Sequence, residues 1–384
     1  MIITIIIFFL VLSVLVFVHE LGHFWTALKF GTGVDEFGFG LPPRIGGVYK
    51  VNGKWRFIWG NKNPEEKTIV YSLNWIPIGG FVKIKGENGQ DKPDADSFAA
   101  KPIWQRIVIL AAGVIMNVLL CVTLLSIGYG VGTPMMVDGT VDSKYLKEEK
   151  VQILQAVAGF GAEKAGIKSG DELLFVDGQK ITGVQMLRDY LVNKKDQSVQ
   201  ISVKRDVEEK TFSVEVKDVG GRAGIGVDLA HTAVVKYPWY RAIWEGAKTT
   251  VVLTGAIFTA LFDLFKKLVT GVSVSADVAG PVGIAVITGQ VTKLGLIYLL
   301  QFMAMLSLNL AVINILPLPA LDGGRILFLI IEKLRGKAMK QQWENMAHNI
   351  GFILIMGLVV IITCSDLVKY GGRIWGGLKH LVGL

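Results

Sequence analysis

The chain has 384 residues, 51% of them hydrophobic, and a formal net charge of +8. This apolar content is too high for an ordinary soluble domain, and the apolar residues form long blocks instead of an amphipathic period. A positive charge can indicate nucleic-acid binding, but basic loops beside anionic lipid explain it better here, so we expect no nucleic-acid partner. The two cysteines, Cys121 and Cys364, both fall inside apolar blocks and indicate no disulfide framework.

Four blocks approach the roughly 20 apolar residues that cross a hydrocarbon core of about 30 Å. The first block lacks a basic n-region and an A-x-A-like cleavage site, so we do not expect it to be removed as a secretory signal. The sequence therefore predicts a polytopic α-helical membrane protein with about four transmembrane helices. The blocks are Ile2–Val18, Ile107–Gly132, Leu294–Leu316 and Ile350–Cys364 with its flanks.

Basic residues in the loops predict how the chain crosses the membrane. Lysines and arginines are frequent in 31–102 and 325–345, and the positive-inside rule places both segments in the cytoplasm. Both termini are then expected outside, together with the long segment 133–293. This topology requires that Val251–Phe265 does not span, and a weakly polar stripe predicts an amphipathic helix in the membrane interface instead. The stripe consists of Lys248, Gly255, Thr259, Asp263 and Lys266.

Two segments outside the apolar blocks carry β-strand patterns. Within 151–228, alternating stretches separated by Gly-Asp and Asp-Gly turns predict a compact β-rich domain with a short helix at Gly183–Val192. In the cytoplasmic segment, lysines alternate with Val82 and Ile84 after a glycine pair, which predicts a hairpin or an exposed strand edge near the membrane. The strands predicted in the β-rich domain are Val151–Val157, Glu172–Val176, Val199–Lys204 and Thr211–Val216.

The motif that carries chemistry is an H-E-x-x-H pattern formed by His19, Glu20 and His23 at the end of the first block. Residues four apart share a helix face, so both imidazoles reach one metal ion, and Glu20 lies where it can take a proton from bound water. Zinc suits two imidazoles plus a carboxylate, with one site left for that water. A chance occurrence is disfavoured, because each unpaired ionisable residue is costly at membrane depth. His19 lies about 26 Å along the helix from Ile2, near the cytoplasmic face of the core.

A third ligand is predicted after the third block. Pro317 and Pro319 break that helix at membrane depth, where irregular backbone is tolerated only beside protein or water, and Asp322 follows directly. The first and third blocks both run from outside to cytoplasm, so Asp322 arrives at the depth of His19 and His23. An Asp-Gly pair is also typical of an ordinary turn, but spacing and topology together favour Asp322 as a ligand.

Taken together, these motifs resemble the site-2 protease family of intramembrane metalloproteases, and specifically its bacterial RseP-like branch (regulator of sigma-E protease). The resemblance extends over nearly the whole chain. It rests on the H-E-x-x-H motif, on Asn314/Pro317/Pro319/Leu321-Asp322-Gly323, on Gly79-Gly80-Phe81-Val82-Lys83, on Phe98…Lys101…Trp104-Gln105-Arg106 leading to Ala112-Gly113 and Asn117, and on Gly280-Pro281-Val282-Gly283-Ile284.

The resemblance implies a zinc metalloendopeptidase in which His19, His23 and Asp322 bind Zn²⁺ and Glu20 is the general base. It also implies a membrane-associated β element that pairs with an unwound substrate, and an asparagine that helps to hold this substrate. The substrate-binding residues that it implies are Asn314, Gly79, Gly80, Phe81, Val82 and Lys83.

The extracytoplasmic stretch resembles a PDZ domain in its Gly161–Asp171 and Gly224–Val227 segments. Proteobacterial relatives carry two such domains, whereas this chain has room for one. The resemblance implies cleavage of transmembrane segments in the bacterial inner membrane, as regulated intramembrane proteolysis in a stress response, with an anti-sigma factor or signal-peptide remnants as substrate classes. The implied partners are transmembrane-helix substrates, the lipid bilayer, and a peptide C-terminus or substrate at the PDZ-like domain.

The patterns and the resemblance together predict how the domains are organised. One β-rich PDZ-like domain is expected outside the cytoplasm and one membrane-associated β-hairpin on the cytoplasmic side. The expected segments are a first transmembrane helix with H-E-x-x-H (1–30), a cytoplasmic or membrane-associated β region (31–102), a second transmembrane helix (103–132), the PDZ-like domain (133–230), an interfacial amphipathic helix with the GPVGI loop (231–293), a third transmembrane helix with NxxPxPxLDG (294–324), a cytoplasmic loop (325–346), and a fourth transmembrane helix with the tail (347–384).

Two other classes of function share part of this pattern. A membrane metal-ion transporter could also carry H-E-x-x-H in a span, but a PDZ-like domain and a single carboxylate after a proline break do not fit metal as cargo. A non-catalytic PDZ scaffold would not need Glu20, because a site that only holds ligands has no use for a general base.

Overall fold

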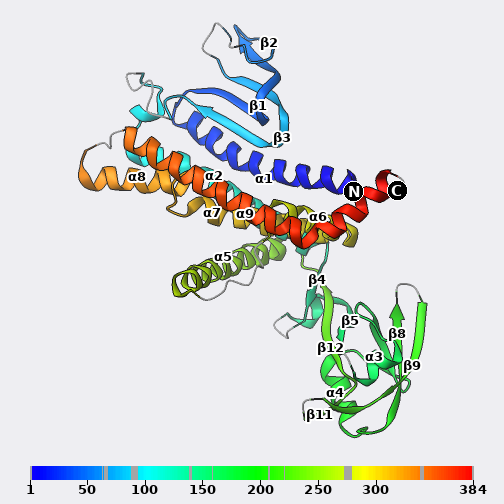
Figure 1. Cartoon of the computed structure of the whole chain (residues 1–384). Helices are drawn as coiled ribbons and strands as arrows, with labels where there is room; N and C mark the ends of the chain where they lie inside the picture. The colour runs from blue at the N-terminus through cyan, green and yellow to red at the C-terminus, as the bar shows by residue number, and fades with distance from the viewer. Residues whose placement is uncertain are drawn as a thin grey trace. The chain divides into compact units, whose positions relative to one another are not determined.

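Figure 1 shows the computed structural model of the chain, which describes residues 2–382 except 63, 65–67, 88–93, 138–140, 158, 206–207, 220, 272–278 and 338–340. The chain divides into two compact units. The first unit contains residues 1–126 and 243–384, and the second contains residues 127–242.

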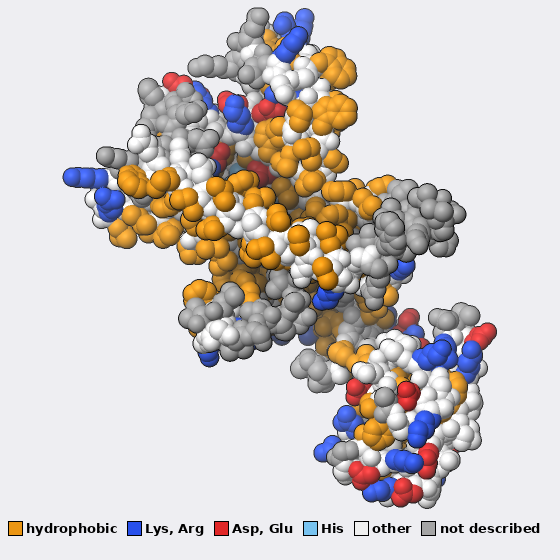
Figure 2. Space-filling model, viewed as in Figure 1, with side chains coloured by type: hydrophobic (Ala, Val, Ile, Leu, Met, Phe, Trp, Pro, Cys, Tyr) orange, Lys and Arg blue, Asp and Glu red, His pale blue; other side chains and the backbone are white. Residues whose placement is uncertain are grey.

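Apolar helices form most of the first unit. Among the described residues, five helices are long and apolar enough to cross a membrane, which is one more than the sequence predicted. Large apolar side chains lie exposed on them, as Figure 2 shows in orange, and Ile353 and Ile361 are each 68% exposed. Such surfaces suit contact with lipid better than contact with water. The five helices are α1 (Ile2–Lys29), α2 (Ile103–Val131), α5 (Trp239–Thr270), α7 (Leu296–Ile315) and α9 (Gln341–Val382).

Helix α5 accounts for the difference in number. The sequence predicted an interfacial helix over Val251–Phe265, whereas α5 has 32 residues. The 18-residue window that makes α5 a candidate span has a mean hydropathy of 1.4, the lowest of the five. Its polar residues are too few to exclude it from the bilayer on composition. The position of α5 in the interface therefore stays a prediction.

Two segments predicted as loops are helical, and the third predicted span ends before its two prolines, as the sequence predicted. The GPVGI segment is not a loop but begins α6 (Pro281–Leu294), because proline suits the first helical position and Asp366 accepts the Gly283 N–H at 2.7 Å. The predicted third span, 294–324, ends as α7 at Ile315, since the two prolines that follow cannot continue a helix. Most of the predicted loop 325–346 is helical, comprising α8 (Asp322–Arg335) and the start of α9.

The predicted β region of 31–102 forms a three-stranded antiparallel sheet instead of a hairpin. Its strands are β1 (Val34–Val51), β2 (Lys54–Trp59) and β3 (Val70–Ile84), in the order β2-β1-β3. The last part of β3, Gly80 to Ile84, pairs with the start of β1, which leaves it as an edge strand beside α1. Phe37 of β1 stacks on Phe24 of α1 with ring centroids 4.5 Å apart, so the sheet is packed directly against the helix that carries the H-E-x-x-H motif.

The second unit is the predicted β-rich domain. A six-strand path with β7 (Gln179–Lys180) attached to β6 surrounds a buried apolar cluster that includes Ile153, Leu187 and Ile201. Near this core Asp171 is almost fully buried; burial opposes its ionisation, but hydrogen bonds from Arg205 outweigh this and lower the pKa of Asp171. In path order the strands are β4 (Thr133–Met136), β12 (Val227–Val235), β5 (Leu146–Ala156), β6 (Glu172–Val176), β8 (Ser198–Arg205) and β9 (Glu208–Glu215).

The remaining elements of this unit lie close to their expected places. Helices α3 (Gly161–Ala165) and α4 (Val184–Val192) accompany the sheet, and β10 (Lys217–Val219) pairs with β11 (Arg222–Gly224). Each of the four strands and the helix that the sequence predicted has a counterpart within a few residues, except that β5 begins five residues before Val151.

Candidate active site

Helix α1 places two imidazoles side by side in a buried position. His19 and His23 are each 6% exposed, and their Nε2 atoms lie 3.2 Å apart. The opposite ring nitrogen of His23, Nδ1, lies 2.8 Å from the carbonyl oxygen of Ile109 in α2. A hydrogen bond donated from Nδ1 to this carbonyl orients the ring and leaves Nε2 free to bind a metal.

Asn117 of α2 supports the other imidazole. Its side-chain amide lies 3.4 Å from His19 Nδ1, while its Oδ1 is buried without a hydrogen-bond partner among the described residues. The oxygen and nitrogen of an amide are assigned from such networks, and turning this amide over lets His19 Nδ1–H donate to Oδ1. His19 is then oriented like His23, with Nε2 presented to the site.

The two histidine rings fit because α1 and α2 approach closely. Both rings lie against the Cα of Gly113, and a Cβ at this position would collide with them. Gly22 likewise packs on the backbone of Ala112, so small residues bring the two helices together, as is typical of helix pairs in membranes. Ala112, Gly113 and Asn117 belong to the motifs of the family resemblance, but no role for them could be predicted from the sequence.

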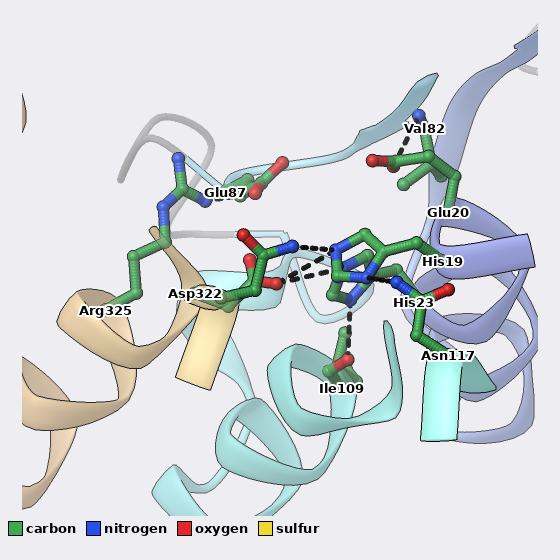
Figure 3. Close-up of polar contacts among 10 residues, drawn as sticks. His19, Glu20, His23, Val82, Glu87, Ile109, Asn117, Asp322 and Arg325 are labelled. Atoms are coloured by element: carbon green, nitrogen blue, oxygen red, sulfur yellow. Dashed lines mark hydrogen bonds and ion pairs between the residues drawn. The ribbon is translucent and has the colours of Figure 1, made fainter. Parts of the chain in front are cut away.

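Asp322 reaches the same point from the other end of the chain. It begins α8, and its Oδ2 lies 3.0 Å from His19 Nε2 and 3.5 Å from His23 Nε2. One ligand atom from each of these residues lies within 4.8 Å of the others. Figure 3 shows the three side chains pointing toward one another. A buried set of two nitrogens and one carboxylate oxygen fits zinc and leaves a position for water.

The segment before Asp322 is held by a contact from α9. Ala320 has a positive φ of 75°, and its N–H donates to His348 Nδ1 at 2.8 Å. This bond fixes the irregular turn after the two prolines and thereby the start of α8. No sequence pattern indicated a role for His348, because it lies 28 residues further along the chain than Ala320.

Glu20 lies between the three ligand residues and the edge strand. Its Oε2 accepts the backbone N–H of Val82 at 3.1 Å. Glu20 follows His19 directly on α1, the helix that carries both imidazoles. Its place fits the role of general base that the sequence predicted.

The predicted substrate-binding residues do not form one cluster. Val82 contacts Glu20, and the Asn314 amide lies 3.4 Å from His19 Nε2, so these two belong to the site. Gly79 and Gly80 pack against α1, where Gly79 has a φ of 71° and donates its N–H to Ser13 Oγ at 3.3 Å.

The last two predicted residues follow on the same strand. Phe81 lies opposite Gly38 of β1. The Lys83 ammonium pairs with Asp35 at 3.3 Å, in an exposed position on the sheet. Within the part of the chain that the structure describes, no hydrogen bond or ion pair joins either side chain to the three ligand residues.

Comparison with known proteins places the chain in a family. The model of peptidase family M50 matches residues 7–358. "Putative zinc metalloprotease CPE1693" of Clostridium perfringens is 35% identical over 94% of this chain and 97% of its own length. "Regulator of sigma-W protease RasP" of Bacillus subtilis is 29% identical over 95% of this chain and 98% of its own length.

Solved PDZ domains of SdrC-like proteins from Listeria monocytogenes and Listeria innocua also match, at 24% and 30% identity. Each match covers 21% of this chain, and the TM-scores of 0.20 and 0.19 are too low to support an argument about fold. The family match, in contrast, includes His19, Glu20, His23 and Asp322. The chain belongs to peptidase family M50, the site-2 protease family of zinc metalloproteases.

Proposed function

We propose that this protease cuts transmembrane segments of other membrane proteins within the bilayer. The observation that carries the proposal is the buried group of His19, His23 and Asp322, with the histidines on a helix of spanning length and Asp322 at the start of α8. Glu20 and a strand edge lie beside this group. In this proposal the three residues hold Zn²⁺. The substrate is a membrane helix, because the two histidines of the site lie on an apolar helix that is long enough to span the bilayer.

The chemistry divides between the metal and Glu20. Bound zinc supplies polarisation of the scissile carbonyl and a lowered pKa for a bound water. Glu20 would take a proton from the water as its oxygen adds to the scissile carbonyl carbon, and would pass this proton to the amide nitrogen as the C–N bond breaks. The carbonyl oxygen of Ile109 and the amide of Asn117 keep the imidazoles in orientation throughout.

Cleavage also requires the substrate helix to unwind, since its own turns shield each peptide bond. The edge of β3 offers backbone groups with which an unwound segment can pair as an added strand. The N–H of Val82, which donates to Glu20, lies on this edge. Pairing there would bring the substrate backbone to the ligand residues.

The biological setting follows from the relatives and from the charge topology. A relative named as a regulator of sigma-W protease favours an anti-sigma factor as substrate class, with signal-peptide remnants as a second class. We place the protein in the bacterial inner membrane, with both termini outside the cytoplasm. In this proposal the PDZ-like domain of 133–230 binds a peptide C-terminus or the substrate.

Purified protein with zinc, reconstituted in liposomes, is expected to cut a single-pass test substrate inside its transmembrane segment. A zinc chelator should stop the reaction, and added zinc should restore it, because the metal supplies the carbonyl polarisation. Mass spectrometry of the products locates the cut. Cuts confined to soluble loops of the substrate would show that the enzyme is not an intramembrane protease.

The orientation has its own test, in a background with Cys121 and Cys364 replaced by alanine. A single cysteine at Lys337, in the basic segment after α8, should be protected from an impermeant thiol reagent in intact cells. A single cysteine at Lys210, whose side chain is 42% exposed in the second unit, should react where the outer barrier permits. The opposite labelling pattern would reverse the proposed topology.

A further inference from the structure

An ion pair connects the end of the edge strand to the helix that begins with Asp322. Glu87 lies just after β3, in a turn closed by its N–H donating to Ile84 O at 3.3 Å. Its carboxylate pairs with the guanidinium of Arg325 on α8. Arg325 lies three residues after Asp322, one turn further along the same face of the helix.

The edge strand is therefore attached at two points around the ligand residues. At Val82 it binds Glu20 of α1, and at Glu87 it binds Arg325 of α8. Figure 3 shows the two attachments on opposite sides of the histidines and Asp322. The stretch between them follows the site from α1 to α8. The strand is also paired with β1, and the two contacts add to this pairing in fixing its position relative to the two helices.

We propose that the Glu87–Arg325 ion pair sets the register in which an unwound substrate pairs with the edge strand, and so selects the peptide bond that meets the ligand residues. This inference rests on the proposed intramembrane cleavage. The pair touches no reacting atom; its two members are positioning residues. In an added strand a shift of one residue moves the backbone by about 3.3 Å, which is enough to exchange one peptide bond for the next.

The pair is not needed merely to hold α8 in place. Glu332, near the other end of α8, lies 3.5 Å from Arg106 of α2, and Leu329 of α8 is buried in the apolar cluster with Phe24 and Ile109. A partly exposed ion pair contributes little to stability by itself. Glu87 and Arg325 are 25% and 28% exposed, and Glu332 and Arg106 are 20% and 14% exposed. The second pair thus provides a control of similar burial that does not involve the edge strand.

The test compares three variants of the zinc-loaded full chain in liposomes with a single-pass test substrate. Glu87→Gln and Arg325→Gln should each lower kcat/KM about tenfold and add cuts at bonds next to the wild-type bond, because small misplacements at a reacting centre are costly. The double variant Glu87→Arg/Arg325→Glu restores the charge pairing and should restore the single cut. The control Glu332→Gln should cut at the wild-type bond only.

A second measurement reports how well the backbone of the strand is held and does not depend on enzyme activity. Hydrogen exchange of the backbone amides of residues 80–87 in the holoenzyme should be faster in both single variants and return toward the wild-type rate in the double variant. A wild-type cut position and exchange rate in the single variants would overturn the register proposal, and so would a loss of zinc, since the pair would then build the metal site. Failure of the wild type itself to cut inside the membrane would instead count against the proposed function. The exchange rates would still show whether the Glu87–Arg325 pair holds the edge strand.

Discussion

Replacing Glu20 by glutamine is expected to abolish cleavage and leave zinc bound. Glutamine keeps the size and the carbonyl oxygen of the side chain, but it cannot take a proton from water. General acid–base catalysis contributes about 10²–10⁴-fold to enzyme rates, so a loss of about a thousandfold in kcat is expected. The measurement is zinc content by elemental analysis of the purified protein together with the rate on a single-pass substrate.

Variants of the ligand residues provide the comparison. His23→Ala and Asp322→Ala each remove one of three ligand atoms that lie within 4.8 Å of one another, so zinc and cleavage should be lost together. Separation of metal binding from catalysis in Glu20→Gln alone identifies Glu20 as the base. Normal zinc content in a His19→Ala/His23→Ala double variant would show that the metal is bound elsewhere.

The ligand set could be predicted from sequence because its parts are local or topological. The spacing of His19 and His23 follows from one helical turn, and Asp322 was expected near them because the first and third spans were predicted to run in the same direction. The proline break before Asp322 explains why α7 ends and why a new helix begins there. The family and its zinc chemistry are confirmed by the comparisons; the role of each side chain stays a prediction.

The supporting contacts could not be predicted, because they join segments far apart in sequence. The Asn117 amide lies 98 residues from His19, and Arg325 lies 238 residues from Glu87. No periodicity signals such pairs. Gly113 is needed only because two imidazoles from another helix lie against it. The third strand of the β1–β3 sheet was missed for a related reason, since strand pairing depends on partners and not on local pattern.

The predicted helix boundaries were wrong where helix-breaking and helix-forming signals overlap. Gly280-Pro281 suggests a turn, yet proline at the first helical position and a carboxylate from α9 start α6 there. Asp366 follows the long apolar stretch of α9 and is only 3% exposed, which that bond to Gly283 explains. From sequence alone it was one acidic residue at the end of an apolar block.

Proline at Val82 is expected to reduce cleavage of a helical substrate sharply, by about tenfold or more, while zinc stays bound. The N–H of Lys85 donates to Gly33, just before β1, at 2.9 Å. The amides of alternate residues in a strand point to opposite edges, so the amide of Val82 points outward, as its bond to Glu20 shows. Proline removes this donor without removing a bond to β1. Val82→Ala is the matched control: it trims the side chain, keeps the amide and should cut at close to the wild-type rate, because main-chain bonds supply the pairing.

The comparison of two substrates separates pairing from an effect on Glu20. A substrate whose transmembrane segment already contains helix-breaking residues needs less help to unwind, so Val82→Pro should slow it less than the helical substrate. An equal loss on both would mean that the proline acts by displacing the Glu20 carboxylate, which Val82 contacts at 3.1 Å. Lys83→Pro, which removes an amide facing β1, should damage the sheet itself and slow both substrates. Wild-type rates for Val82→Pro on the helical substrate would show that this edge takes no part in substrate pairing.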